Sequence, residues 1–168
     1  GLGDVYKRQW LFSMNNSLSY KGFELSVFLQ GIAGNKIYNA NNIDNTGMAA
    51  AYNQTTDVLK RWQGEGTSNS MPRAVFGDPN QNTRVSDRFV ENGSYLRLKN
   101  VTLSYDLSDV FRKWSHLNDR NSRLSVYFSG ENLATITGYS GMDPECGGWD
   151  ALKYPVSRVL SVGVKLTY

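Results

Sequence analysis

Apolar and polar residues alternate with a period of two in five segments of the chain. The first two segments, residues 10–20 and 23–30, are separated only by Lys21 and Gly22. Two alternating runs joined by such a pair are typical of a β-hairpin with a tight turn. The other alternating segments are residues 94–107, 123–130 and 158–168. The pattern therefore predicts an all-β chain of antiparallel strands, each with one apolar face.

The segment at residues 94–107 changes phase in its middle. Its apolar residues fall on even positions up to Leu98 and on odd positions from Val101 onward. One additional residue near Lys99 and Asn100 would return all of them to a single face, which is the effect of a β-bulge. We therefore expect a bulged strand at this position.

The connections between the strands differ in length. Residues 31–94 and 138–157 form two long connections, and the first is rich in Asn, Gly, Ser and Thr. Within it, the stretch TTDVLKRW at residues 55–62 begins with capping residues and predicts a short helix. Residues 21–22 and 109–121 are expected to be turns. Long loops at one end and shorter turns at the other are typical of outer-membrane barrels, in which the long loops face the outside.

Two architectures fit these alternating strands. Alternation alone favours a soluble β-sandwich. The last strand, however, has about 11 residues, which is the length that crosses a bilayer at a tilt. Aromatic residues also lie at the short-turn ends of the strands, as in an interfacial girdle: Tyr20, Phe23, Tyr105 and Tyr168. These features favour a segment of a membrane barrel. A soluble extracellular carbohydrate-binding β-sandwich stays open as the alternative, whereas a complete small barrel would need about eight strands to close.

The residues that carry most catalytic and metal chemistry are scarce in this chain. The net charge of +3 is scattered without a basic cluster, which argues against nucleic-acid binding. His116 and Cys146 are the only histidine and cysteine, so neither a zinc site nor an internal disulfide framework is expected. No apolar run approaches the about 20 residues of a spanning helix. The sequence predicts neither an enzyme nor a helical membrane protein, and no cofactor or metal.

Residues 1–9, GLGDVYKRQ, fit no pattern found in the rest of the chain. They resemble a translated sequencing-adapter artefact that occurs at broken ends of reading frames, with an ordinary polar loop as the alternative. We therefore expect the native sequence to occupy residues 10–168. No signal peptide precedes the strands, which leads us to expect that the native N-terminus lies further upstream.

Several long stretches carry a family resemblance. They are LSYKGFELSVFLQGIAGNKIYN, SDRFVENGSYLRLKNVTLSYDL, SGENLATITGYSGMDPE and YPVSRVLSVGVKLTY, at residues 18–39, 86–107, 129–145 and 154–168. In this order they resemble the C-terminal end of the SusC/RagA family, the TonB-dependent outer-membrane transporters of the Bacteroidetes type. The resemblance covers nearly everything after Gln9.

The resemblance implies a specific fold and function. The fold would be about five C-terminal strands of an antiparallel up-and-down transmembrane β-barrel of 22 strands, with long extracellular loops and the plug domain upstream. The function would be import of oligosaccharides, or of peptides, across the bacterial outer membrane. Implied partners are a SusD-like surface lipoprotein, the TonB-ExbB-ExbD complex, the barrel-assembly machinery and outer-membrane lipid.

Candidate functional residues form three groups. The C-terminal residues match the polar-x-Gly-x-x-apolar-x-aromatic signal that the assembly machinery reads in bacterial barrels: Ser161, Gly163, Leu166 and Tyr168. Residues expected to face lipid are Val101, Leu103, Tyr105, Leu160, Val162, Val164 and Leu166. Loop aromatic residues that could bind substrate or the partner lipoprotein are Tyr38, Trp62, Tyr139, Trp149 and Tyr154. For these aromatic residues, packing of loop against loop is the alternative.

Overall fold

The structure is a computed structural model that describes residues 9–115 and 123–167. The chain divides into two compact units. The sheet unit comprises residues 9–33, 94–138 and 155–168, and the loop unit contains residues 34–93 and 139–154, as far as these residues are described. The prediction that residues 1–9 are not native concerns residues outside the described ones, except for Gln9. Each unit is described by itself below.

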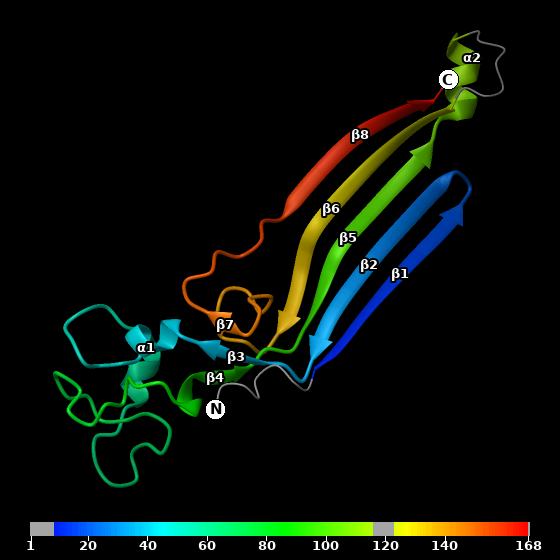
Figure 1. Cartoon of the computed structure of the whole chain (residues 1–168). Helices are drawn as coiled ribbons and strands as arrows, with labels where there is room; N and C mark the ends of the chain where they lie inside the picture. The colour runs from blue at the N-terminus through cyan, green and yellow to red at the C-terminus, as the bar shows by residue number, and fades with distance from the viewer. Residues whose placement is uncertain (1–8, 116–122, 168) are drawn as a thin grey trace. The chain divides into compact units, whose positions relative to one another are not determined.

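The sheet unit is one antiparallel sheet of five long strands, which confirms the predicted strand pattern (Figure 1). Their order in space is their order in the chain, β1-β2-β5-β6-β8. The strands are β1 (Trp10–Tyr20), β2 (Phe23–Ala33), β5 (Tyr95–Asp106), β6 (Arg123–Thr137) and β8 (Val159–Thr167). This up-and-down order, in a single sheet within the described part of the unit, differs from the two face-to-face sheets of a sandwich.

The turn and the bulge lie where the sequence predicts them. Lys21 and Gly22 have φ angles of 47° and 85°, the left-handed conformation that a two-residue hairpin turn requires. In the β2–β5 ladder Phe28 is opposite Asn100 and Leu29 is opposite Leu98, so Lys99 is the additional residue. The bulge keeps the apolar residues on both sides of it on one face of β5.

Strand β6 is longer than its alternation predicts. The sequence indicates a strand at residues 123–130, whereas β6 continues to Thr137. Gly130 and Asn132 interrupt the apolar series, and Asn132 has a φ of 52°, so the pattern is lost while the pairing continues. Leu133 fills the space beside Gly130, where a Cβ atom would lie 2.8 Å from a Leu133 methyl carbon.

The predicted turn at residues 109–121 is wrong in its first part, where helix α2 (Ser108–Ser115) forms. The Ser108 N–H donates to Asp106 Oδ1 at 2.8 Å, and the Phe111 N–H donates to the Leu107 carbonyl at 2.9 Å. An Asp109–Arg112 ion pair joins successive turns. These contacts join residues that are near one another in the sequence, but they have no period of two, so alternation does not predict the helix. Residues 116–122, including His116, lie outside the described residues.

The two long connections form a small folded unit of their own. Strand β3 (Lys36–Asn39) pairs antiparallel with β4 (Val90–Asn92) and parallel with β7 (Trp149–Asp150). The helices of this unit are α1 (Asn41–Asn45) and the 3₁₀ helices η2 (Thr56–Lys60) and η3 (Asp87–Phe89). Helix η2 confirms the short helix predicted at residues 55–62.

Aromatic side chains form the core of the loop unit. Tyr38 is 1% exposed, stacks on Trp149 with ring centroids 4.8 Å apart, and meets the edge of Phe89. Ile37, Tyr139 and Cys146 form a second buried cluster. Segments at residues 36–39, 89–92 and 139–150 are therefore held together by apolar burial as well as by strand pairing.

Candidate functional site

One face of the sheet unit carries continuous rows of apolar side chains. The register places one row across all five strands: Leu18, Leu25, Leu103, Phe128 and Val162. The neighbouring row, toward the Lys21-Gly22 turn, consists of Tyr20, Phe23, Tyr105, Val126 and Val164. Val162 is 81% exposed and Leu18 is 66% exposed. An apolar surface of this extent marks contact with a membrane or another protein.

The same register places all seven residues predicted to face lipid on this apolar face. Val101 and Leu160 are both paired with Gly130, one row further from the turn than Leu103 and Val162. Leu166 is opposite Leu124 near the C-terminal end of β8. The rings of Phe23 and Tyr105 lie 4.4 Å apart where β2 and β5 approach the turn.

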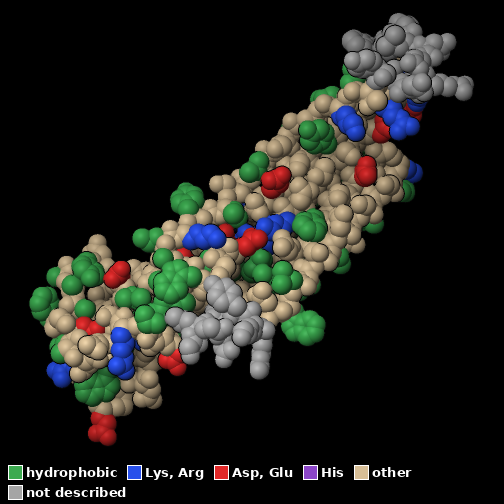
Figure 2. Space-filling view, viewed as in Figure 1, with side chains coloured by type: hydrophobic (Ala, Val, Ile, Leu, Met, Phe, Trp, Pro, Cys, Tyr) green, Lys and Arg blue, Asp and Glu red, His purple; other side chains and the backbone are tan. Residues whose placement is uncertain are grey.

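The opposite face of the sheet is polar. One of its rows consists of Ser17, Ser26, Thr102, Ser129 and Ser161. Arg97 Nε donates to Thr135 Oγ1 at 2.9 Å across β5 and β6. Lys165 lies on this face beside Ser125 and lines a hollow that also contains Glu24, Asp106 and Arg123. Figure 2 shows the strands under a mostly tan surface with scattered acidic and basic side chains.

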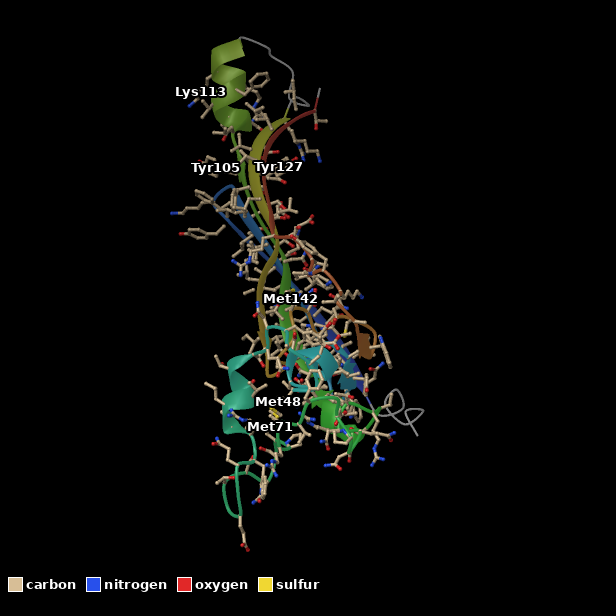
Figure 3. All side chains as sticks on the ribbon, turned by 90° about the vertical axis from the view of Figure 1, so that its left-hand side faces the viewer. Met48, Met71, Tyr105, Lys113, Tyr127 and Met142 are labelled. Atoms are coloured by element: carbon tan, nitrogen blue, oxygen red, sulfur yellow. The ribbon has the colours of Figure 1, made fainter. Side chains whose placement is uncertain are left out.

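Gly163 has a specific packing role on the polar face. It is paired with Tyr127, and a Cβ atom at position 163 would lie 2.4 Å from the Tyr127 ring. The ring therefore occupies the place that a side chain at position 163 would take. Tyr127 and Tyr105, both labelled in Figure 3, belong to opposite faces of the sheet because Tyr105 is paired with Val126.

The proposed C-terminal signal is divided between the two faces. Ser161 and Gly163 lie on the polar face and Leu166 lies on the apolar face. Tyr168 lies outside the described residues.

In the loop unit, the Glu91 carboxylate is a centre of hydrogen bonding. Glu91 Oε1 accepts hydrogen bonds from Asn39 Nδ2 and Asn42 Nδ2, both at 3.0 Å, and from Ser140 Oγ at 2.8 Å. The Ser140 N–H donates to Glu91 Oε2 at 3.0 Å. The Glu91 side chain therefore links β3, α1 and Ser140 to β4 by hydrogen bonds.

A second polar contact lies inside the core of the loop unit. The Tyr139 hydroxyl donates to Asp150 Oδ2 at 2.6 Å, and both residues are buried. Burial, together with the Asp150 carboxylate, raises the pKa of Tyr139 well above its ordinary value. Burial likewise raises the pKa of the Cys146 thiol. Both groups are therefore neutral at physiological pH.

Two hollows open within the loop unit. One, of about 470 Å³, is lined by asparagines and by Asp150, Leu152 and Tyr154. The other, of about 530 Å³, is lined by Trp62, three arginines and polar side chains of residues 68–88. No group of three or more His, Cys, Asp or Glu side chains suited to a metal ion occurs in the described parts of the chain. Over those same residues, no helix is both long and apolar enough to cross a membrane.

The five candidate loop aromatics occupy different environments. Tyr38 and Tyr139, 1% and 6% exposed, lie in the core, and Trp149 covers Tyr38. Trp62 and Tyr154 instead line the two hollows. The hydrogen-bonding role of Glu91 was missed by sequence reasoning, because a single Glu beside Asn carries no local pattern.

Comparison with known proteins gives consistent matches, although no family model matches the chain. It is 32% identical over 167 residues to TonB-dependent receptor P3 of Formosa agariphila, across 92% of this chain and 16% of that protein. It is 28% identical over 174 residues to TonB-dependent receptor SusC of Bacteroides thetaiotaomicron, across 99% of this chain and 15% of SusC. The RagAB peptide importer in its open-open state matches with a TM-score of 0.74 and 27% identity, across 95% of this chain. The chain belongs to the SusC/RagA family of TonB-dependent receptors.

Membership of the SusC/RagA family accounts for the open five-stranded sheet, which matches a segment of the RagA barrel. The closed-closed state of the RagAB importer also matches, with a TM-score of 0.74, 28% identity and coverage of 92% of this chain. The chain spans 15–17% of the lengths of these relatives. The relatives are named as receptors and importers, in agreement with the expectation that the chain is not an enzyme.

Proposed function

We propose that this chain is the C-terminal part of a TonB-dependent importer in the bacterial outer membrane. The observation that carries the proposal is the exposed apolar face of its antiparallel sheet, in a chain of the SusC/RagA family. Lipid would cover the apolar rows, and the polar face would line the interior of the barrel. In this arrangement every strand has a neighbour once the remaining strands of the barrel are present, as hydrocarbon requires.

The importer takes up oligosaccharides or peptides together with a SusD-like surface lipoprotein, and energy reaches it through TonB, ExbB and ExbD. Support comes from the relatives, which include SusC and the RagAB peptide importer. Trp62 and Tyr154 are the loop aromatics available to ligand, because they line the hollows of the loop unit. Residues 10–168 belong to the barrel, and residues 1–9 are not native.

The proposed orientation is supported by the lengths of the connections. Ala33, Tyr95 and Thr137 lie at one end of the sheet, from which the long connections leave, and the Lys21-Gly22 turn lies at the other end. Because long loops of outer-membrane barrels face the outside, the loop unit is extracellular and the turn is periplasmic. The barrel-assembly machinery reads Ser161, Gly163, Leu166 and Tyr168.

The orientation is tested with epitope tags in the full-length transporter that contains this segment. Antibody should bind intact cells tagged near Asn42 or Gly148, and should bind cells tagged near Gly22 only after the outer membrane is permeabilised. Surface exposure of the Gly22 tag alone would show the opposite orientation. Equal recovery of all three proteins in a soluble fraction would contradict the barrel.

Energy coupling is tested by uptake. Import of the substrate by cells that carry the transporter should stop when TonB is deleted, while the amount of folded barrel in the membrane stays constant. Unchanged import without TonB would contradict the proposal.

A further inference from the structure

The arginine-lined hollow of the loop unit has an unusual charge. Its volume is about 530 Å³, within the range of small-molecule sites. Arg73, Arg84 and Arg88 line it, whereas none of its lining residues is Asp or Glu. The remaining walls consist mainly of Ser and amide side chains, with Trp62 as their aromatic member. Three positive charges thus share one concave surface with no carboxylate among the lining side chains.

Hydrogen bonds within the loops build the walls. The Trp62 N–H donates to the Met71 carbonyl at 3.1 Å, which joins the tryptophan to the segment that carries Arg73. On the other wall, the Asp78 carboxylate accepts bonds from the Asn82 and Thr83 N–H groups, both at 2.8 Å. The Thr83 hydroxyl also donates to Asp78 Oδ2 at 2.6 Å. This bond, followed by the backbone bonds, lowers the pKa of the Asp78 carboxyl. Asp78 closes its own turn and does not line the hollow, and its carboxylate attracts the Arg88 guanidinium, so Arg73 and Arg84 are the arginines left for a ligand.

The three arginines differ in their contacts. The Arg88 guanidinium donates to the carbonyls of Asn82 and Thr46, at 3.3 and 3.2 Å, and is half-buried. The Arg88 guanidinium also donates to Met71 Sδ at 3.1 Å, and it therefore links both walls of the hollow to the segment after α1. By contrast, no hydrogen bond joins the guanidinium of Arg73 or Arg84 to another of the described residues, and both side chains are exposed.

Trp62 provides a flat surface next to one of these charges. The Arg73 guanidinium carbon lies 5.9 Å from the centroid of the Trp62 ring, at the outer limit of a cation–π contact. The guanidinium lies over one face of the indole, so a ring-shaped ligand that contacts the remaining surface of Trp62 would bring an acidic substituent close to Arg73.

We infer that this hollow binds an anionic saccharide, with Arg73 and Arg84 contacting a carboxylate or sulfate group and Trp62 contacting the sugar ring. The guanidinium group matches planar and tetrahedral oxyanions with paired hydrogen bonds. The amide side chains of Asn80 and Asn82 supply donors and acceptors for ring hydroxyls. The inference rests on the proposed importer function, and it narrows the substrate to acidic oligosaccharides.

The experiment measures binding to the purified full-length transporter by calorimetry. The probes are two matched pairs: tetragalacturonate and its methyl ester, and a sulfated carrageenan tetrasaccharide and its desulfated form. At least one acidic probe should bind about tenfold more tightly than its neutral partner, and the preference should fall as salt is raised. Each of Arg73→Gln and Arg84→Gln should weaken binding of that probe by about tenfold.

Two further variants serve as matched controls. Arg61→Gln removes the same charge from a neighbouring position that does not line the hollow, and it should leave affinity unchanged. Trp62→Ala should weaken binding of the acidic probe and of its neutral partner by the same factor, because it removes the surface that the sugar ring contacts. Heat-modifiable gel migration confirms that every variant is folded in the outer membrane.

Several outcomes would overturn the inference. They are equal affinity for acidic and neutral probes, failure of both acidic probes to bind, and unchanged affinity in both arginine variants. A loss of the copurifying lipoprotein with unchanged saccharide affinity would also overturn it and would make the hollow a protein contact. Failure of the importer function itself is separate, because it is seen as loss of TonB-dependent uptake or of membrane location.

Discussion

The sheet unit and the loop unit place their apolar side chains in opposite ways. In the sheet unit, Val162 and its row lie exposed on one face. In the loop unit, Tyr38 is buried against Phe89, and Tyr139 is buried with Ile37 and Cys146. The loop unit is organised for water outside and apolar contacts inside, whereas the sheet has its apolar surface outside. One chain therefore contains two units that are suited to different solvents.

The largest loss of folded barrel is expected when a charged side chain is placed on the apolar face of the sheet. Val162→Arg should reduce the amount of folded barrel strongly, since an arginine on the lipid face costs about 2–4 kcal/mol near the midplane. Val164→Arg, in the row that contains Tyr20, should cost less because it lies nearer the interface. Heat-modifiable migration of membrane fractions measures the folded amount. Normal levels of Val162→Arg would show that this face does not meet lipid.

A smaller loss is expected when the space over Gly163 is filled. Gly163→Val forces the Tyr127 ring out of its place, and overpacking of this kind costs about 1–3 kcal/mol. Urea unfolding of the barrel in detergent measures the change. The double variant with Tyr127→Ser should recover part of the loss, because the obstructing ring is gone. Strict additivity of the two changes would mean that the ring and position 163 do not interact.

A substitution in the core of the loop unit should destabilise that unit without any change in the amount of folded barrel. Tyr139→Phe leaves the buried Asp150 carboxylate without its hydroxyl donor, which costs about 1–2 kcal/mol. Limited proteolysis should cleave the loop unit faster, while heat-modifiable migration stays the same. A parallel loss of folded barrel would show that the two units do not fold independently.

The same tyrosine predicts an alkaline limit for the loop unit. Because the folded-state pKa of Tyr139 is raised above 10.0, its stabilising contribution is complete below pH 10 and is lost as pH rises through the raised value. Proteolysis of the wild-type loop unit should therefore accelerate above about pH 10 more than that of Tyr139→Phe. Equal acceleration in both proteins would exclude this tyrosine as the cause.

The smallest effect is expected on the polar face of the sheet. Lys165→Ala removes a side chain that lines a polar hollow beside Ser125 and Asp106. The change in the free energy of unfolding should stay within about 0.5 kcal/mol. This variant is the control for Val162→Arg, since it changes a charge by one unit on the same strand. A loss of stability as large as that of Val162→Arg would show that the lipid-facing and interior-facing sides of the sheet are the reverse of those assigned.

The sheet was readable from the sequence because alternation is a local signal. Lys99 could be placed as a bulge since the parity of the apolar residues changes around it. The end of β6 could not be placed, because Gly130 and Asn132 break the apolar series while cross-strand hydrogen bonds continue. Helix α2 was missed because its stabilising contacts have no period of two.

The loop unit was much less predictable, because its order depends on contacts between distant segments. Glu91 meets Asn39 and Ser140, residues 52 and 49 positions away, and the sequence does not mark them as partners. The aromatic residues were recognised as candidates, but their exposure depends on the strands that surround them. Only the structure separates Tyr38, in the core, from Trp62, on a hollow.

The buried thiol of Cys146 also makes the chain convenient for site-directed labelling. It is the only cysteine of the chain, and its raised pKa keeps the sulfur protonated and slow to react with maleimides at neutral pH. A cysteine introduced at an exposed position such as Leu152 would therefore accept a fluorophore or spin label while Cys146 stays unmodified. Two such positions, one in each unit, would report the distance between the units by spectroscopy.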